Sequence, residues 1–199
     1  MEVETSPDRP LHGEIDVERL FAECPSSFLL KGMFFRRIAK LLGGRLDGLL
    51  ARLEAPPGRA GWLPFRDYPQ RDYTLLSVEA ARLHHPRQSD REALRRLARE
   101  DVHVFAGSML GRVMMSVVGD TKRALLELPG VYEKVASGPW GFEMASIGER
   151  EVRFAIGQHP GEWCYQIGQC EGIAAHYGDR LRTRAVPKTG GGVELFFSW

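Results

Sequence analysis

The chain has 199 residues, 43% of them hydrophobic, which is enough to bury the core of one large or two small domains. Its 27 lysines and arginines nearly balance 26 acidic residues, so no overall field favours nucleic acid or an anionic membrane as a partner. Three widely spaced cysteines argue against a disulfide framework and favour a reducing compartment, the cytoplasm. No window approaches the roughly 20 apolar residues that span a bilayer, which excludes a membrane span.

The first 14 residues are acidic, contain proline and lack an apolar run, so we expect a flexible tail there and no signal peptide. Residues 15–199 are expected to form a single domain, of which 15–136 repeat apolar residues mainly at helical spacing. The pattern predicts helices near 16–24, 34–42 and 46–53, a loop over 54–65, and then a helix capped by Asp72.

The longest helix is predicted from Ser89 to Val118. It begins with a capping box, in which Ser89 and Glu92 satisfy free backbone donors of the first turn. Asp120 is expected to cap a following helix that Pro129 interrupts.

Residues 138–199 change from helical spacing to alternation and back. Two hairpins are expected on either side of a helix over 161–177, which Gly178 ends. Glu194 is expected to pair with arginines of the opposing strand, and Gly168 and Gly172 are expected to let the helix approach the sheet closely. The fold class is therefore α+β, an N-terminal helical segment followed by a four-stranded antiparallel sheet in the order strand, strand, helix, strand, strand.

Cys164, Cys170, His159 and His176 gather in one region, but steps of six residues on a helix rotate side chains apart, so we expect no metal site. His159 with Cys164 is the closest candidate for a catalytic pair, and an enzyme of unrecognised type remains an alternative. The charges of residues 87–101 have mixed signs, which is typical of a solvated helix face and not of a nucleic-acid site.

Methionine and aromatic side chains adapt to varied apolar ligands, and several of them could line a cavity. The candidate ligand-binding residues are Tyr132, Met109, Met114, Trp140, Met144 and Trp163.

The order of elements from Asp101 to Trp199 resembles the haem nitric oxide/oxygen binding (H-NOX) domain and its vinyl-reductase-like and TRAPP-like relatives. The motifs that carry the resemblance are Leu110-Gly111-Arg112, Leu128-Pro129 and Glu171-Gly172. Over most of its length the chain also resembles an uncharacterised family of chains of similar length, found mainly in myxobacteria. That resemblance rests on KGMFFRR (31–37), the pairs Tyr68-Pro69 and Asp72-Tyr73, and LPGVY (128–132).

The resemblance implies a histidine that ligates haem iron, and the corresponding position here is Tyr132. It also implies a Tyr-x-Ser-x-Arg clamp for the haem propionates, where this chain reads RFAIGQHP (153–160). The departures lead us to expect no cofactor, although tyrosine can ligate ferric haem, and a gas sensor that uses Tyr132 remains an alternative.

We therefore expect a non-enzymatic cytoplasmic regulatory or adaptor domain with a sensor-like fold. Its partner is expected to be an apolar small molecule or a protein, with a homodimer as one form of the second.

Overall fold

The computed structural model describes residues 12–107, 109–157, 161–189 and 192–199, and for residues 109–111, 113 and 114 it describes the backbone alone. The helices are α1 Val17–Glu23, α2 Gly32–Leu42, α3 Gln70–His84, α4 Asp90–Gly107, α5 Met109–Val118, α6 Thr121–Leu126, α7 Leu128–Val135 and α8 Cys164–His176, with 3-10 turns η1 Gly43–Arg45 and η2 Leu50–Arg52. The strands are β1 Leu29–Lys31, β2 Asp67–Pro69, β3 Ala136–Ser137, β4 Phe142–Gly148, β5 Glu151–Ile156, β6 Arg182–Pro187 and β7 Val193–Ser198.

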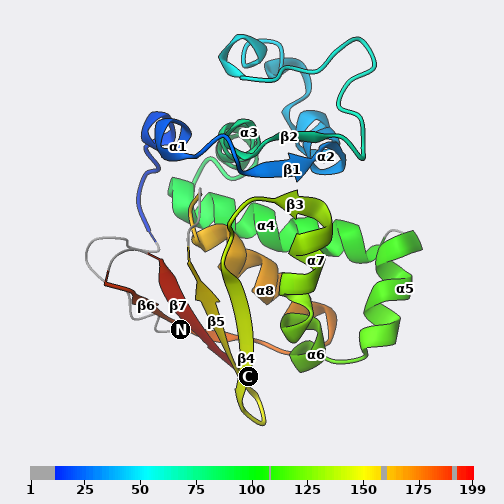
Figure 1. The fold of residues 1–199 in the computed structure, drawn as a ribbon, viewed down its shortest axis with the longest axis vertical. Coiled ribbons are helices and arrows are strands. Elements are labelled where there is room, and N and C mark those ends of the chain that lie inside the picture. Colours follow the sequence, from blue (N-terminus) through cyan, green and yellow to red (C-terminus); the bar gives the residue numbers. More distant parts are fainter. Residues whose placement is uncertain (1–11, 108, 158–160, 190–191) are drawn as a thin grey trace.

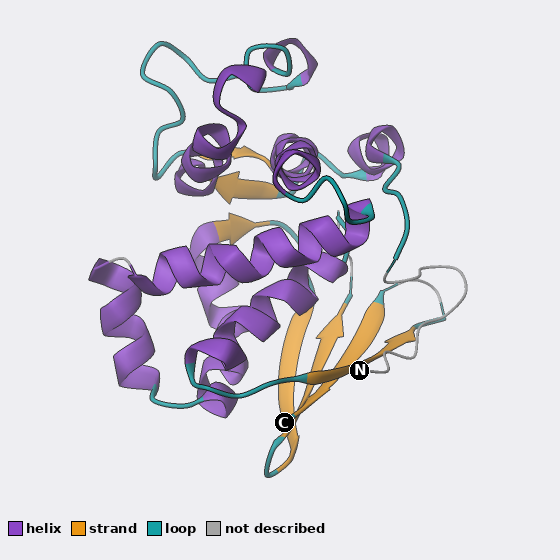
Figure 2. Ribbon diagram, turned by 180° about the vertical axis from the view of Figure 1, so that it is seen from behind, coloured by secondary structure: helices purple, strands orange, loops and turns teal. Residues whose placement is uncertain are grey.

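Helix α4 crosses the middle of the molecule (Figure 1). Helices α1 to α3 lie on one side of it, and α5 to α8 lie on the other side with the larger sheet (Figures 1 and 2). This arrangement is the α+β fold predicted for the chain. Among the helices that the structure describes, none combines the length and hydrophobicity needed to cross a bilayer.

The larger sheet has four antiparallel strands in the order β4, β5, β7, β6, and α8 connects its two hairpins as predicted. The alternation in the sequence gives the buried face correctly, because Phe154, Leu195 and Phe197 are at most 1% exposed. Helices cover this face, whereas no described helix covers the opposite one (Figures 1 and 2). The sheet therefore keeps one open face.

A second sheet of three strands, in the order β2, β1, β3, was not predicted. Its strands have only two or three residues, too few for alternation to be visible in a sequence. It joins the segment before α2 to the segments before α3 and after α7, and so connects the two sides of the molecule.

The predicted helix from Ser89 to Val118 is two helices, because α4 ends at Gly107 and α5 runs in another direction (Figure 1). Residue 108 between them lies outside the described residues. Half of the predicted capping box is present, since the backbone N–H of Ser89 donates to Glu92 at 3.4 Å. The Ser89 hydroxyl differs from the prediction, because it donates to the same carboxylate at 3.0 Å, whereas a capping box makes it an acceptor for the backbone of the first turn. The third predicted helix, near 46–53, is reduced to the turn η2.

Two other boundaries differ from the prediction. Helix α3 begins at Gln70, so Asp72 lies inside its first turn, where it is fully buried and accepts hydrogen bonds from the backbone N–H groups of Glu54 and Ala55, both at 2.9 Å. Pro129 does not only interrupt a helix but stands in the first turn of α7, a position that proline tolerates because the N–H it lacks has no helical partner there. Asp120 caps α6 as predicted, by accepting from the N–H of Arg123.

Helix α8 crosses α4 at close range. A Cβ atom on Gly168 would lie 2.1 Å from the backbone oxygen of Arg95, and one on Gly172 would lie 2.8 Å from that of Arg99. The close approach that we predicted for these glycines is therefore made, but to α4 and not to the sheet.

Ion pairs flank this crossing. Arg91 pairs with Glu162 at 3.2 Å, and Arg95 pairs with Glu171; each of the four side chains is at most 13% exposed. The interpretation of residues 87–101 as a solvated face is therefore wrong for Arg91 and Arg95, which face α8.

Because of this crossing, we expect alanine at two helical glycines to change the free energy of unfolding in opposite directions. Gly168→Ala should destabilise the protein by about 1–3 kcal/mol, because an added methyl group at a close backbone contact forces the helices apart. Gly130→Ala in α7 is the matched control, since a Cβ there meets nothing within 4 Å. It should be neutral or stabilising by up to about 1 kcal/mol, because alanine favours helix. Urea unfolding measures both, and equal effects would contradict the proposed close packing.

Candidate functional site

Tyr132 lies on α7, in the interior between the two halves of the protein. Its ring packs edge-on against Phe142 with centroids 4.7 Å apart, and against Trp140 at 5.8 Å. Tyr132 and Phe142 are partly buried, and both contact the two hydrophobic clusters into which the core divides. The ring therefore joins the cluster built around α2 and α3 to the cluster that lies on the four-stranded sheet.

The hydroxyl of Tyr132 points to α8. It donates a hydrogen bond to Oε1 of Gln169. Burial raises the pKa of Tyr132 above its ordinary value, because the charged phenolate would lose its hydration. At neutral pH the side chain is therefore a protonated phenol with a satisfied hydrogen bond.

Further aromatic rings extend this contact in both directions. Trp140 packs edge-on against Phe28 at 5.0 Å, and Phe142 packs against Phe154 of β5 at 5.2 Å. Phe28 and Phe154 are at most 1% exposed, and Trp140 is 8% exposed. A continuous series of rings thus runs from the segment before β1 to the sheet.

A polar chain lies on a neighbouring part of the interior. The hydroxyl of Tyr73 is 2.9 Å from that of Tyr165, which donates to Asp101 at 3.1 Å, and Asp101 forms an ion pair with Arg37. Burial raises the pKa of both tyrosines. Because these four side chains come from α2, α3, α4 and α8, their hydrogen bonds and ion pair fix how those helices meet.

The predicted ligand-binding residues do not all meet. Tyr132 and Trp140 are in contact, but Trp163 and Met144 belong to the second cluster, where Trp163 is 4% exposed and Met144 pairs with Phe154 across the strands. Met109 and Met114 lie on α5, and their side chains are outside the described residues. A cavity lined by all six residues stays a prediction.

The sequence reasoning missed four residues of this region. Phe142 and Gln169 contact Tyr132, Phe28 packs against Trp140, and Gln166 is buried on α8. The two glutamines carried a signal, since they are polar residues in an otherwise apolar helical segment. Gln166 is only 3% exposed.

The cysteines belong to the hydrophobic core. All three are free and buried, and burial raises the pKa of the Cys164 thiol, the opposite of what a nucleophile needs. His159 lies outside the described residues, so the proposed pair with Cys164 stays untested. Among the described residues, no three His, Cys, Asp or Glu side chains are placed to hold a metal ion.

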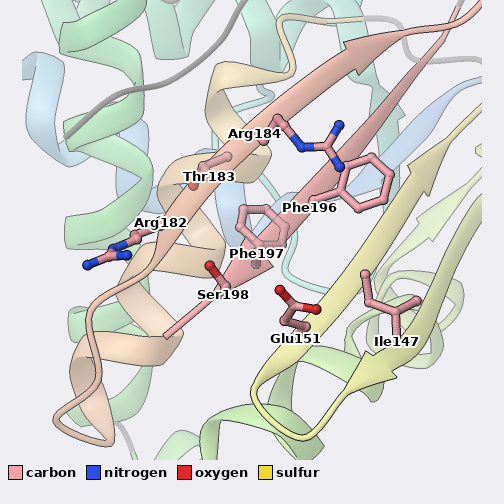
Figure 3. A pocket seen from close by; sticks show the side chains of 8 residues that line it. All are labelled: Ile147, Glu151, Arg182, Thr183, Arg184, Phe196, Phe197 and Ser198. Atoms are coloured by element: carbon pink, nitrogen blue, oxygen red, sulfur yellow. The ribbon is translucent and has the colours of Figure 1, made fainter.

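The open face of the sheet carries a second candidate site, a hollow of about 280 Å³ (Figure 3). The guanidinium of Arg184 lies over the ring of Phe196 at 4.1 Å, and Ile147 borders the hollow with 49% of its surface exposed. The residues that line the hollow are Ile147, Glu151, Arg182, Thr183, Arg184, Phe196, Phe197 and Ser198.

The charge pairing predicted on this face differs from the one observed. Glu194 lies opposite Val186 of β6, so it pairs with Arg153 at 3.3 Å and Lys188 at 3.8 Å and not with the arginines of β6. Arg182 and Arg184 are exposed and form no ion pair within the part of the chain that the structure describes.

Solved structures of H-NOX proteins share this fold. Two crystal structures of H-NOX protein from S. oneidensis, one in the Fe(II)NO state and one of a mutant in the Fe(II) state, match with TM-scores of 0.63 and 0.66. The first is 10% identical in sequence and the second 9%. Both matches cover 85% of this chain, and they cover 98% of the first structure's chain and 95% of the second's. Unliganded Fe(II) H-NOX from K. algicida matches with a TM-score of 0.62 and 12% identity, over 85% of this chain and 96% of its own. The fold is therefore H-NOX-like.

The sequence defines the family more narrowly. Residues 26–199 match the family described as "Protein of unknown function (DUF2378)", and the chain belongs to that family. No curated protein matches the sequence. The expected links to vinyl-reductase-like and TRAPP-like proteins and to myxobacteria stay predictions.

The side chains around Tyr132 do not fit the haem that the resemblance implies. Coordination by Tyr132 would require the phenolate, whereas burial favours the phenol, and its hydroxyl is already bonded to Gln169. Rings of Trp140 and Phe142 lie directly against it. Arg153, which begins the segment corresponding to the propionate clamp, pairs with Glu143 and Glu194 on the open face of the sheet.

The bond between Tyr132 and Gln169 can be tested by a double-mutant cycle. Tyr132→Phe should destabilise the protein by about 1–3 kcal/mol, because it leaves a glutamine amide without its partner in the interior. Adding Gln169→Leu removes the amide and should recover part of this loss, giving a coupling of at least about 0.5 kcal/mol in urea unfolding. Strictly additive effects would show that the two side chains do not interact.

Proposed function

We propose that this protein is a non-enzymatic regulatory domain of the cytoplasm that uses an H-NOX-like fold without haem and acts by binding a protein partner. The observation that carries the proposal is the contact of Tyr132 with Gln169, Trp140 and Phe142. Tyr132 occupies the position that corresponds, by the resemblance, to the haem-ligating histidine, and these three residues pack around it.

A protein partner is favoured over an apolar small molecule for the same reason. A ligand next to Tyr132 would have to displace packed rings and break a hydrogen bond in the interior, which costs free energy before any contact is gained. An enzyme is disfavoured because the Cys164 thiol is buried and its pKa is raised.

The open face of the sheet is the surface that we assign to the partner. Exposed Arg182 and Arg184 present two positive charges, and stacking on Phe196 orients the guanidinium of Arg184. A planar guanidinium beside an aromatic ring suits a carboxylate on an adjoining apolar segment. We therefore propose that the partner contributes an acidic segment.

Site-specific photo-crosslinking in the cells that make the protein tests this assignment. A photo-reactive amino acid in place of Ile147, at the edge of the hollow, should give a discrete adduct with one protein. Combining it with Arg182→Glu and Arg184→Glu should abolish the adduct, because reversed charges repel an acidic segment.

The matched control places the same photo-reactive residue at Val104 on α4, which is 56% exposed and distant in sequence and position from the hollow. It should not give that adduct. The same adduct from both positions, or an adduct that survives both charge reversals, would contradict the proposed partner surface.

A further inference from the structure

We propose that the protein also docks on anionic membrane surfaces, through a lobe at the end of the molecule opposite the four-stranded sheet. The lobe comprises the exposed side of α2, the turns η1 and η2 and the loop that leads to β2 (Figures 1 and 2). This inference does not depend on the partner proposed for the sheet.

The charge of the chain is unevenly distributed. Residues 31–66 contain eight lysines and arginines and only two acidic residues, although the whole chain has 27 against 26. Three of the eight form ion pairs with acidic residues elsewhere: Lys31 with Asp67, Arg37 with Asp101 and Arg52 with Glu18. The remaining five form no ion pair within the described residues: Arg36, Lys40, Arg45, Arg59 and Arg66.

Helix α2 presents part of this charge along one side. Met33, Arg36 and Lys40 are exposed and recur at helical spacing, while Phe35, Ile38 and Leu42 are buried on the opposite side. The exposed side of α2 therefore offers two cations in line with an apolar residue at the start of the helix.

Apolar side chains project beside these cations. Phe65 is 83% exposed and Leu63 is 47% exposed, and the loop that carries them meets the start of α2, where the N–H of Met33 donates to the Pro64 oxygen at 3.1 Å. Arg59 and Arg66 lie around the same loop, since both line a hollow of about 220 Å³ together with Leu63.

The loop is held in this conformation. The N–H of Leu63 donates to the hydroxyl of Tyr68 at 2.9 Å, and the N–H of Gly32 donates to the Arg66 oxygen at 2.9 Å. A Cβ on Gly32 would lie 2.3 Å from the Leu63 oxygen, so glycine is needed at the start of α2 for the loop to approach. The exposure of Phe65 is therefore built into the packing.

An anionic bilayer matches both properties. Basic side chains are attracted by the negative surface potential, and exposed aromatic and aliphatic side chains enter the boundary between headgroups and acyl chains. Exposing the Phe65 ring to water is unfavourable, whereas burying it in a bilayer would recover that free energy.

Vesicle sedimentation tests the proposal with the full chain. The protein should bind vesicles that contain phosphatidylserine more tightly than vesicles of phosphatidylcholine alone, and added salt should weaken the binding because it screens exposed charges. Arg36→Gln with Lys40→Gln should lower the partition coefficient about 25-fold, since each basic residue contributes about fivefold. Phe65→Ser should lower it at least about tenfold, because the ring no longer enters the bilayer.

Arg182→Gln with Arg184→Gln is the control, because it removes the same charge from the open sheet face and should leave vesicle binding unchanged. Circular dichroism should show that all variants remain folded, since every altered side chain is on the surface. The proposal is overturned if neither vesicle binds, if both bind equally, or if either lobe variant binds like the wild type.

Discussion

The close crossing of α8 over α4 is the constraint on which the rest of the structure depends. Gly168 and Gly172 bring the two helix backbones together, and the ion pairs of Arg91 and Arg95 hold α8 on both sides of the contact. The crossing sets the orientation of α8 about its axis and so directs Gln169 towards Tyr132. The hydrogen bond that satisfies this tyrosine is thus a consequence of how two helices pack.

Tyr132 is hydrogen-bonded and packed, so the interior of this H-NOX-like fold is filled by side chains around it. The rings next to Tyr132 join the two hydrophobic clusters, so the region stabilises the fold through its own side chains. In the function that we propose, recognition takes place on the outside, at two surfaces that lie at opposite ends of the molecule. Such an arrangement would allow a membrane-bound protein to present its sheet to a second protein.

The sequence was sufficient for features that depend on local pattern. Alternation identified Phe154, Leu195 and Phe197 as the inner face of the sheet, and the pair of Ser89 and Glu92 correctly marked the start of α4. It was insufficient where a partner distant in the chain decides the outcome. Asp72 looks like a helix cap until the backbone of Glu54 and Ala55 is placed beside it, and Glu194 looks like a partner of the β6 arginines until the strand register is known. The role of Gln169 could be recognised only once the position of α8 relative to Tyr132 was known.

The most direct test of a closed, haem-free interior is a native mass spectrum of the protein made in haem-replete cells, compared with its mass after denaturation. The account predicts that each folded subunit has the mass of the polypeptide alone, whether the protein is a monomer or a dimer. Additional mass that is lost on denaturation, and above all the mass of one haem per chain, would contradict it.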